Sequence, residues 1–308
     1  MTRERADITI IDSHIHFFSY RFFEEYARWR GEGLPAHDPD ALLRQLGWEV
    51  PPRDPVSLGH RWIEELDRHG IARAVLLTSI IGDEESVAQA VRAFPERFAG
   101  YTRVDPAEPD TPHQVRRAVR ELGLKGIKLF PSMEQFHASD RTAYALYEEA
   151  QSLEVPVLFH FGILQSAVRS ALGLPSRADM RFANPADVQP AARDFPRLRF
   201  VIPHFGAGYF REALMVCYHC PNVSLDTSGS NAWIKYLGHP MDLRTVFRLA
   251  LEAVGAGRII FGTDSTHFPR GLREDVLATQ LQILRDLDVP AQDIQRIMGG
   301  NVAEILNL

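Results

Sequence analysis

The chain has 308 residues, of which 34 are basic and 40 acidic, so its formal net charge is −6. Its 45% hydrophobic and 24% charged residues match an ordinary globular protein and argue against a disordered or fibrous chain. It has no basic run that would neutralise a row of phosphates, so we expect no nucleic-acid partner.

The sequence also carries no signal for secretion or membrane insertion. Its first residues, MTRERADITIID, lack the apolar segment of a signal peptide, and stretches such as VPVLFHFGIL are too short to span a bilayer. Two cysteines cannot crosslink a chain of this length. We therefore expect a cytoplasmic protein that makes no contact with a membrane.

Eight short apolar runs, rich in β-branched residues, predict strands that are buried on both faces. They lie at 8–12, 74–79, 98–104, 126–130, 155–161, 199–205, 222–226 and 258–264. Segments with helical signals lie between the strands, at 59–70, 110–122, 139–153, 183–195, 241–255 and 272–287. Gly70 and Gly255 are typical helix stops, and Thr111 is expected as the N-cap of a helix whose first residue is Pro112.

This alternation predicts a (β/α)8 TIM barrel, because helical crossovers imply parallel strands. No G-x-G-x-x-G follows the first strand, which argues against a dinucleotide-binding sheet. A barrel needs about 250 residues, so residues 1–308 are expected to form one domain with two additions. The first is an insertion at 19–58, which predicts a lid over the barrel mouth or, alternatively, contacts in a homodimer. The second is a helical tail from about 288.

Coordinating side chains recur where the predicted strands end, the place where barrel active sites form. His14 and His16 alternate with Ile15, so both imidazoles point to the same side of the first strand. The later strand ends carry Lys128, His160, His204 and Asp264. Each alone is more often a core or capping residue, but together they favour a site. Imidazoles with one carboxylate suit Zn²⁺, with Mn²⁺, Fe²⁺ or Co²⁺ as alternatives.

These residues also carry a family resemblance. The ordered motifs IDSHIHFF, GIKLFP, VPVLFHFG, VIPHFGAG and FGTDS resemble the amidohydrolase superfamily, in particular its amidohydrolase-2 branch of metal-dependent TIM-barrel enzymes. The resemblance runs from Asp12 nearly to the end of the chain. It implies that His14, His16 and His160 bind one divalent metal, with Asp264 at the metal from the eighth strand.

The same resemblance implies catalytic roles for three residues. Asp264 would accept a proton from water and pass it to the leaving group. His204 would either bind a second metal or donate a hydrogen bond to the substrate carbonyl. Lys128 would either be carboxylated and bridge two metals or remain an ammonium that anchors a substrate carboxylate. We favour one metal over two.

One motif departs from its relatives, many of which have Lys-Leu-His-Pro where this chain has Lys128-Leu129-Phe130-Pro131. Phe130 replaces an imidazole with an aromatic wall, which favours a partly apolar or aromatic substrate. Arg103, Trp233 and His267 are further candidates for substrate binding, because they follow predicted strands on the same face.

The sequence thus predicts a metal-dependent hydrolase that cleaves an amide or lactone bond of a small carbonyl compound. The alternative is a non-oxidative decarboxylase of an aromatic or unsaturated carboxylic acid, since this branch uses nearly the same ligand set for both. Hydration of a double bond is a third reading. A catalytically silent binding barrel is the fourth, and the intact set of motif residues argues against it.

Overall fold

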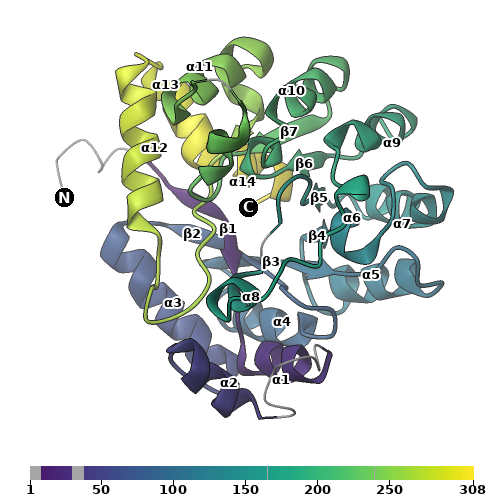
Figure 1. Ribbon diagram of the computed structural model, residues 1–308, viewed down its shortest axis with the longest axis vertical. Coiled ribbons are helices and arrows are strands. Elements are labelled where there is room, and N and C mark those ends of the chain that lie inside the picture. The colour runs from purple at the N-terminus through teal and green to yellow at the C-terminus, as the bar shows by residue number, and fades with distance from the viewer. Residues whose placement is uncertain (1–7, 30–37, 165, 239) are drawn as a thin grey trace.

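Eight parallel strands form the centre of the molecule (Figure 1). The structure is a computed structural model that describes residues 8–29, 38–164, 166–238 and 240–308. The strands pair in chain order: β1 Ile11–His16, β2 Arg73–Leu77, β3 Phe98–Arg103, β4 Gly126–Leu129, β5 Val157–Phe159, β6 Phe200–Ile202, β7 Val223–Asp226 and β8 Ile259–Ile260. This arrangement confirms the predicted TIM barrel.

The barrel closes between β8 and β1 through the segment that follows β8. The amide of Ser13 donates to the carbonyl of Phe261, and the amide of His16 donates to the carbonyl of Ser265. The amide of Asp264 in turn donates to the carbonyl of His14 over 2.9 Å. The closure therefore holds Asp264 against the histidines of β1.

Three strands are shorter than the sequence predicts, because the chain leaves the extended conformation before the functional residues. His160 follows β5, and His204 and Asp264 follow β6 and β8. His204 and Asp264 have φ angles of 55° and 59°, in the left-handed region that non-glycine residues rarely adopt. Such residues cost on the order of 1–3 kcal/mol each and cluster at functional sites.

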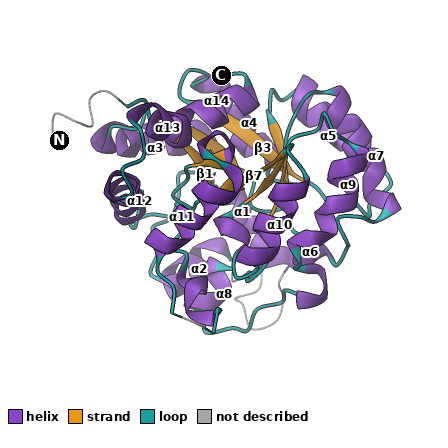
Figure 2. Ribbon diagram, turned by 90° about the horizontal axis from the view of Figure 1, so that it is seen from above, coloured by secondary structure: helices purple, strands orange, loops and turns teal. Residues whose placement is uncertain are grey.

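Helices surround the strands as the fold requires (Figure 2). They are α3 Pro55–His69, α4 Glu84–Ala93, α5 Thr111–Arg120, α7 Arg141–Ser152, α9 Val188–Asp194, α10 Phe210–His219, α11 Leu243–Val254 and α12 Glu274–Asp286. Two shorter helices, α6 Pro131–Glu134 and α8 Ala167–Ala171, lie in the connections that follow β4 and β5. Gly70 adopts the left-handed conformation after α3, as predicted, whereas α5 begins at Thr111 with Asp110 at the cap position. No helix among the described residues is long and apolar enough to cross a membrane.

The insertion after β1 folds into two helices, α1 Tyr20–Trp29 and α2 Pro39–Leu46, before α3 begins at Pro55. Residues 30–37 lie outside the described part of the chain. The two helices share one apolar cluster with Phe18, Ile80 and Val168 of α8. Figure 2 shows α2 and α8 at the end of the barrel opposite to α14.

The tail contains α13 Ala291–Gln295, a π-helical turn Arg296–Gly300 and α14 Asn301–Leu306. Val302 and Leu306 pack into the barrel against inward-facing residues of β1, β2, β3, β5, β6 and β8. Lys125 donates from its ammonium to the carbonyls of Leu306 and Asn307, which anchors the end of α14. The tail is therefore the plug of the barrel end that lies away from the site.

Shortening a buried side chain of this plug is expected to destabilise the whole fold. Leu306→Ala removes a side chain that is 3% exposed, so the free energy of unfolding should fall by about 2–5 kcal/mol. Glu304→Ala, on the exposed side of the same helix, should change it by less than about 0.5 kcal/mol. Urea denaturation followed by circular dichroism measures both, and equal effects would show that α14 is not a structural plug.

Candidate metal centre

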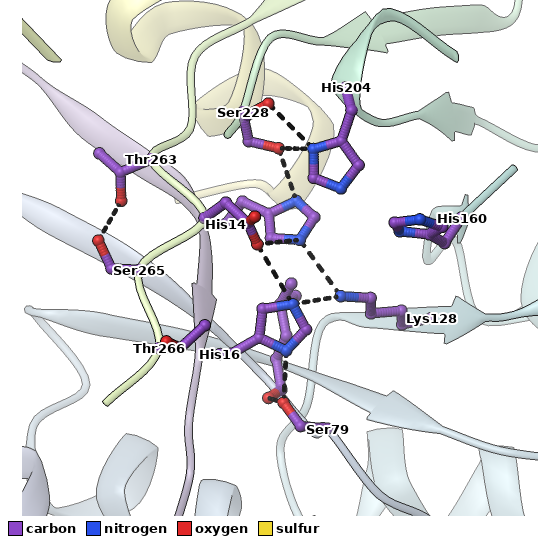
Figure 3. Close-up of polar contacts among 12 residues, drawn as sticks. His14, His16, Ser79, Lys128, His160, His204, Ser228, Thr263, Ser265 and Thr266 are labelled. Atoms are coloured by element: carbon purple, nitrogen blue, oxygen red, sulfur yellow. Dashed lines mark hydrogen bonds and ion pairs between the residues drawn. The ribbon is translucent and has the colours of Figure 1, made fainter. Parts of the chain in front are cut away.

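The predicted polar residues meet at the carboxyl ends of the strands (Figure 3). His14 and Lys128 are fully buried, and His160 and His204 are 7% and 8% exposed. Burial of this many titratable groups is costly unless each is paired or holds a ligand. The contacts of each residue therefore indicate what the site can bind.

His14 is oriented by a carboxylate from β7, which only β8 separates from β1. Its Nδ1 lies 2.7 Å from Oδ2 of Asp226, the last residue of β7, and both side chains are buried. Burial would raise the pKa of Asp226, but the contact with His14 holds it below its usual value. Asp226 is then an ionised acceptor, so the proton of His14 sits on Nδ1 and the Nε2 lone pair faces the site.

His16 is oriented in a similar way by Ser79. The Ser79 hydroxyl donates to the carbonyl of Leu77, and it lies 2.6 Å from Nδ1 of His16, from which it can accept. This leaves Nε2 of His16 without a proton. Burial, with the nearby Lys128, lowers the pKa of His16 to about 3, so the imidazole is neutral at physiological pH.

Lys128 lies between these two imidazoles. Its ammonium is 3.2 Å from Nε2 of His14 and 3.2 Å from Nε2 of His16, and it can donate to both (Figure 3). Burial lowers the pKa of Lys128 to about 7. The two roles predicted for Lys128, a carboxylated bridge or an ammonium anchor, both stay predictions.

His204 and Asp264 complete the centre. His204 donates from Nδ1 to the carbonyl of Ser228 over 2.9 Å, so its Nε2 is free to bind a ligand. Oδ1 of Asp264 lies 3.4 Å from Nε2 of His16 and 3.8 Å from Nε2 of His14. Burial alone would raise the pKa of Asp264, but its contacts with these imidazoles hold it below its usual value.

These atoms fit a divalent cation. One ligand atom from each of His14, His204 and Asp264 lies within 4.8 Å of the others. Imidazole nitrogens beside one carboxylate form a donor set that suits zinc or manganese. The predicted ligands His14 and Asp264 belong to this group, which includes His204 in place of His16 and His160. The ligand roles of His16 and His160 stay predictions.

The His160 side chain contacts a backbone carbonyl in the loop after β5. Its Nε2 lies 3.3 Å from the carbonyl of Ile163, and its ring stacks on Phe130 with centroids 5.5 Å apart. Its ring centroid is also 4.9 Å from that of His204, so it remains next to the centre. Burial holds the pKa of His160 well below its usual value, which keeps the ring neutral.

A cavity of about 360 Å³ opens above the centre. His16, His160, His204 and Asp264 form its polar base, and the predicted binding residues Arg103, Phe130 and Trp233 line its wall. His267 lies away from this wall and stacks on Trp48 with ring centroids 3.6 Å apart. The cavity is large enough for a small organic substrate.

The insertion also contributes to this cavity. Phe22 and Tyr26 of α1 line it together with Phe18. The lining places α1 at the rim of the mouth, and the role of the insertion as a lid stays a prediction. A role in dimer contacts stays a prediction.

Sequence reasoning missed the residues that orient the histidines. Asp226 ends the predicted strand 222–226 and could have been found by the same strand-end argument that selected Asp264. Ser79 likewise ends the predicted strand 74–79. Ser228, which follows β7, carried no comparable signal, and neither did the cavity residue Arg169 of α8.

The barrel and its buried cluster define a metal-dependent TIM-barrel enzyme. The family model described as Amidohydrolase matches residues 11–308. The chain therefore belongs to the amidohydrolase-2 family of the amidohydrolase superfamily, as its motifs predicted.

Known relatives perform different reactions. The chain is 33% identical over 244 residues to 2-keto-4-carboxy-3-hexenedioate hydratase of Sphingobium sp., with 71% of this chain and 68% of that protein covered. It is 26% identical over 272 residues to dihydroorotase of Ralstonia nicotianae, with 77% and 74% covered. The family is thus established, and its members carry out more than one reaction.

A solved structure shows the same fold. It is 5-carboxyvanillate decarboxylase from Novosphingobium aromaticivorans, complexed with manganese and 4-hydroxy-3-methoxy-5-nitrobenzoic acid. The TM-score is 0.66 at 16% identity, and the match covers 98% of this chain and 97% of that one.

Asp226→Asn should weaken metal binding indirectly, through the loss of the carboxylate that contacts Nδ1 of His14. An amide cannot support the basicity of His14 as a carboxylate does, so affinity for Zn²⁺ should fall about 10–100-fold. Competition with a chromophoric chelator measures this affinity on the purified chain. The surface variant Asp288→Asn serves as control. Wild-type zinc affinity in Asp226→Asn would mean that the contact with His14 does not tune the site.

Proposed function

We propose that this chain is a metal-dependent hydrolase that uses water to cleave an amide or lactone bond of a small, partly apolar carbonyl compound. The observation that carries the proposal is the position of Asp264. Its carboxylate is 32% exposed at the base of the cavity, within 4 Å of two neutral imidazoles. It can therefore accept a proton from a water molecule that enters the cavity.

The metal in this proposal is one divalent ion, with Zn²⁺ favoured over Mn²⁺, Fe²⁺ and Co²⁺. His14, His204 and Asp264 would hold it, and His16 and His160 complete the ligand set that the motifs imply. A bound divalent cation polarises a carbonyl and lowers the pKa of a water ligand from about 16 toward 7. A second ion bridged by Lys128 is the alternative.

The chain's own groups supply the proton transfers. Asp264 accepts the proton of the attacking water and returns it to the leaving nitrogen or oxygen. His204, which lines the cavity, has two alternative roles: either its Nε2 binds the metal, or the doubly protonated ring donates from Nε2 to the substrate carbonyl oxygen. Phe130 and Trp233 exclude water from the apolar part of the substrate.

Hydration of a carbon–carbon double bond is the second candidate. It is favoured by the 33% identity to a hydratase, and it needs the same proton acceptor for water. Decarboxylation instead needs an acid that protonates carbon. The Asp264 carboxylate instead reaches the cavity, where it can accept a proton from water, so its position favours reactions that use water.

A panel of substrates in ¹⁸O-labelled water separates the three reactions. We expect the zinc-loaded chain to open lactones or cyclic amides that carry a carboxylate, and to incorporate ¹⁸O into the new carboxyl group. Dialysis against a chelator should abolish turnover, and Zn²⁺ or Mn²⁺ should restore it. Incorporation of ¹⁸O into a new hydroxyl group, formed from an unsaturated keto acid, would show that the reaction is hydration and not hydrolysis. Release of carbon dioxide from aromatic carboxylates, with no bond opening by water, would refute the proposal.

Asp264→Asn tests the proton acceptor. An amide cannot accept the proton, so turnover should fall by about 100–10,000-fold, while the fold and much of the metal content remain. Asp288→Asn is a matched control, because Asp288 also has a positive φ of 52° but lies on the surface. Steady-state kinetics and metal analysis measure the outcome, and turnover within threefold of wild type would remove Asp264 from this role.

A further inference from the structure

The wall of the cavity is rich in positive charge. Arg103, Arg169 and Lys235 line it, and Asp264 is the one carboxylate among the described lining residues. Asp264 faces the imidazoles of the metal centre, so it does not neutralise the opposite wall. The charge of the cavity thus indicates an anionic ligand.

Arg103 already has a partner for its charge. Its Nη2 donates to Oε1 of Glu134, and both side chains are buried. Its Nη1 donates to the carbonyl of Ser79 over 2.6 Å, and its guanidinium lies over the ring of Phe130. Arg103 is therefore fixed and neutralised by the protein, with only its Nε–H buried without a partner among the described residues.

Arg169 differs in this respect. It is 6% exposed, and its Nε donates to the carbonyl of Pro175 over 2.6 Å. Its Nη1 is buried without a hydrogen-bond partner in the described part of the chain, and no carboxylate there pairs with it. A buried guanidinium without an anion is costly, so a ligand carboxylate at this position would remove a real energetic penalty.

The position of Arg169 is held by the rim of the barrel. It belongs to α8, where Val168 packs into the apolar cluster of α1 and α2. The hydroxyl of Tyr26 on α1 lies 3.2 Å from that of Ser166, the cap residue of α8. The insertion therefore fixes the helix that presents Arg169 to the cavity.

We propose that Arg169 binds a substrate carboxylate that is separate from the bond that reacts. A guanidinium can hold a carboxylate through two parallel N–H donors, which selects for this group. The aromatic residues Phe22, Phe130 and Trp233 of the same wall fit a flat, unsaturated body between this carboxylate and the metal centre. The substrate class is therefore an aromatic or unsaturated acid with one carboxylate at Arg169 and a second reacting or polar group at the metal centre.

This inference deepens the proposed function, but it is tested by binding and not by turnover. The probes are isophthalate, which has two carboxylates, and 3-methylbenzoate, which has one on the same ring. Isothermal titration calorimetry on the zinc-loaded full chain measures both dissociation constants. We expect the wild type to prefer isophthalate by at least tenfold, and Arg169→Met to reduce this preference to less than threefold.

Two further variants complete the experiment. Arg181→Gln, an arginine of the same β5–β6 connection that is 77% exposed, should keep the wild-type preference. Arg169→Lys retains the charge but loses the paired donors, so its affinity for isophthalate should be at least fivefold weaker than wild type. This variant decides the question if Arg169→Met does not fold.

Wild-type affinity of either Arg169 variant for isophthalate would overturn the proposal, and so would a wild type that does not distinguish the two probes. A failure of hydrolysis with every compound would leave these binding results unchanged. The two proposals can therefore fail separately.

Discussion

The contact between Asp226 and His14 is the interaction on which the site depends. It joins the end of β7 to β1, and both side chains are buried. An ionised carboxylate in this position is tolerated because it accepts the imidazole proton, and the imidazole is fixed in one tautomer for the same reason. The Nε2 lone pair of His14 then faces Lys128 and Asp264. Without this contact, only the Ser228 hydroxyl, 3.1 Å from the same nitrogen, would orient the His14 imidazole, and no charged group would support its basicity.

The two ends of the barrel have separate roles. At one end, α14 inserts Val302 and Leu306 among the inward-facing apolar side chains and closes the core. At the other end, the interior is polar, and the chain accepts unusual backbone conformations at His204 and Asp264. Barrel enzymes commonly place stability and catalysis at opposite ends in this way. The insertion adds a third part, because α1 supports both the apolar rim and the helix that carries Arg169.

The repeating part of the architecture could be predicted from the sequence. Continuous apolar runs locate the strands, and coordinating residues at their ends locate His14, Lys128, His204 and Asp264, because parallel strands bring those positions together. The ends of the strands after Ile202 and Ile260 could not be predicted, since left-handed conformations at His204 and Asp264 leave no pattern in the residues. The role of α14 could not be predicted either, because an amphipathic helix has the same sequence pattern whether it packs on the outside of a barrel or closes its end.

Residues outside the repeat were the hardest to find. Arg169 lies in the connection between β5 and β6, and nothing in its neighbours distinguishes it from the exposed Arg181. Its importance arises from burial and from the lack of a carboxylate beside it in the described chain, which are properties of packing. His267 shows the converse case, because its position after Asp264 predicted a cavity residue, whereas stacking on Trp48 holds it elsewhere.

The central claim is that these buried side chains hold a single divalent cation. Anomalous diffraction at the zinc absorption edge, on crystals of the zinc-loaded chain, tests it most directly. The account predicts one anomalous peak per chain, within bonding distance of Nε2 of His14 and the carboxylate of Asp264. Two peaks bridged by a carboxylated Lys128, or no peak among these residues, would contradict it.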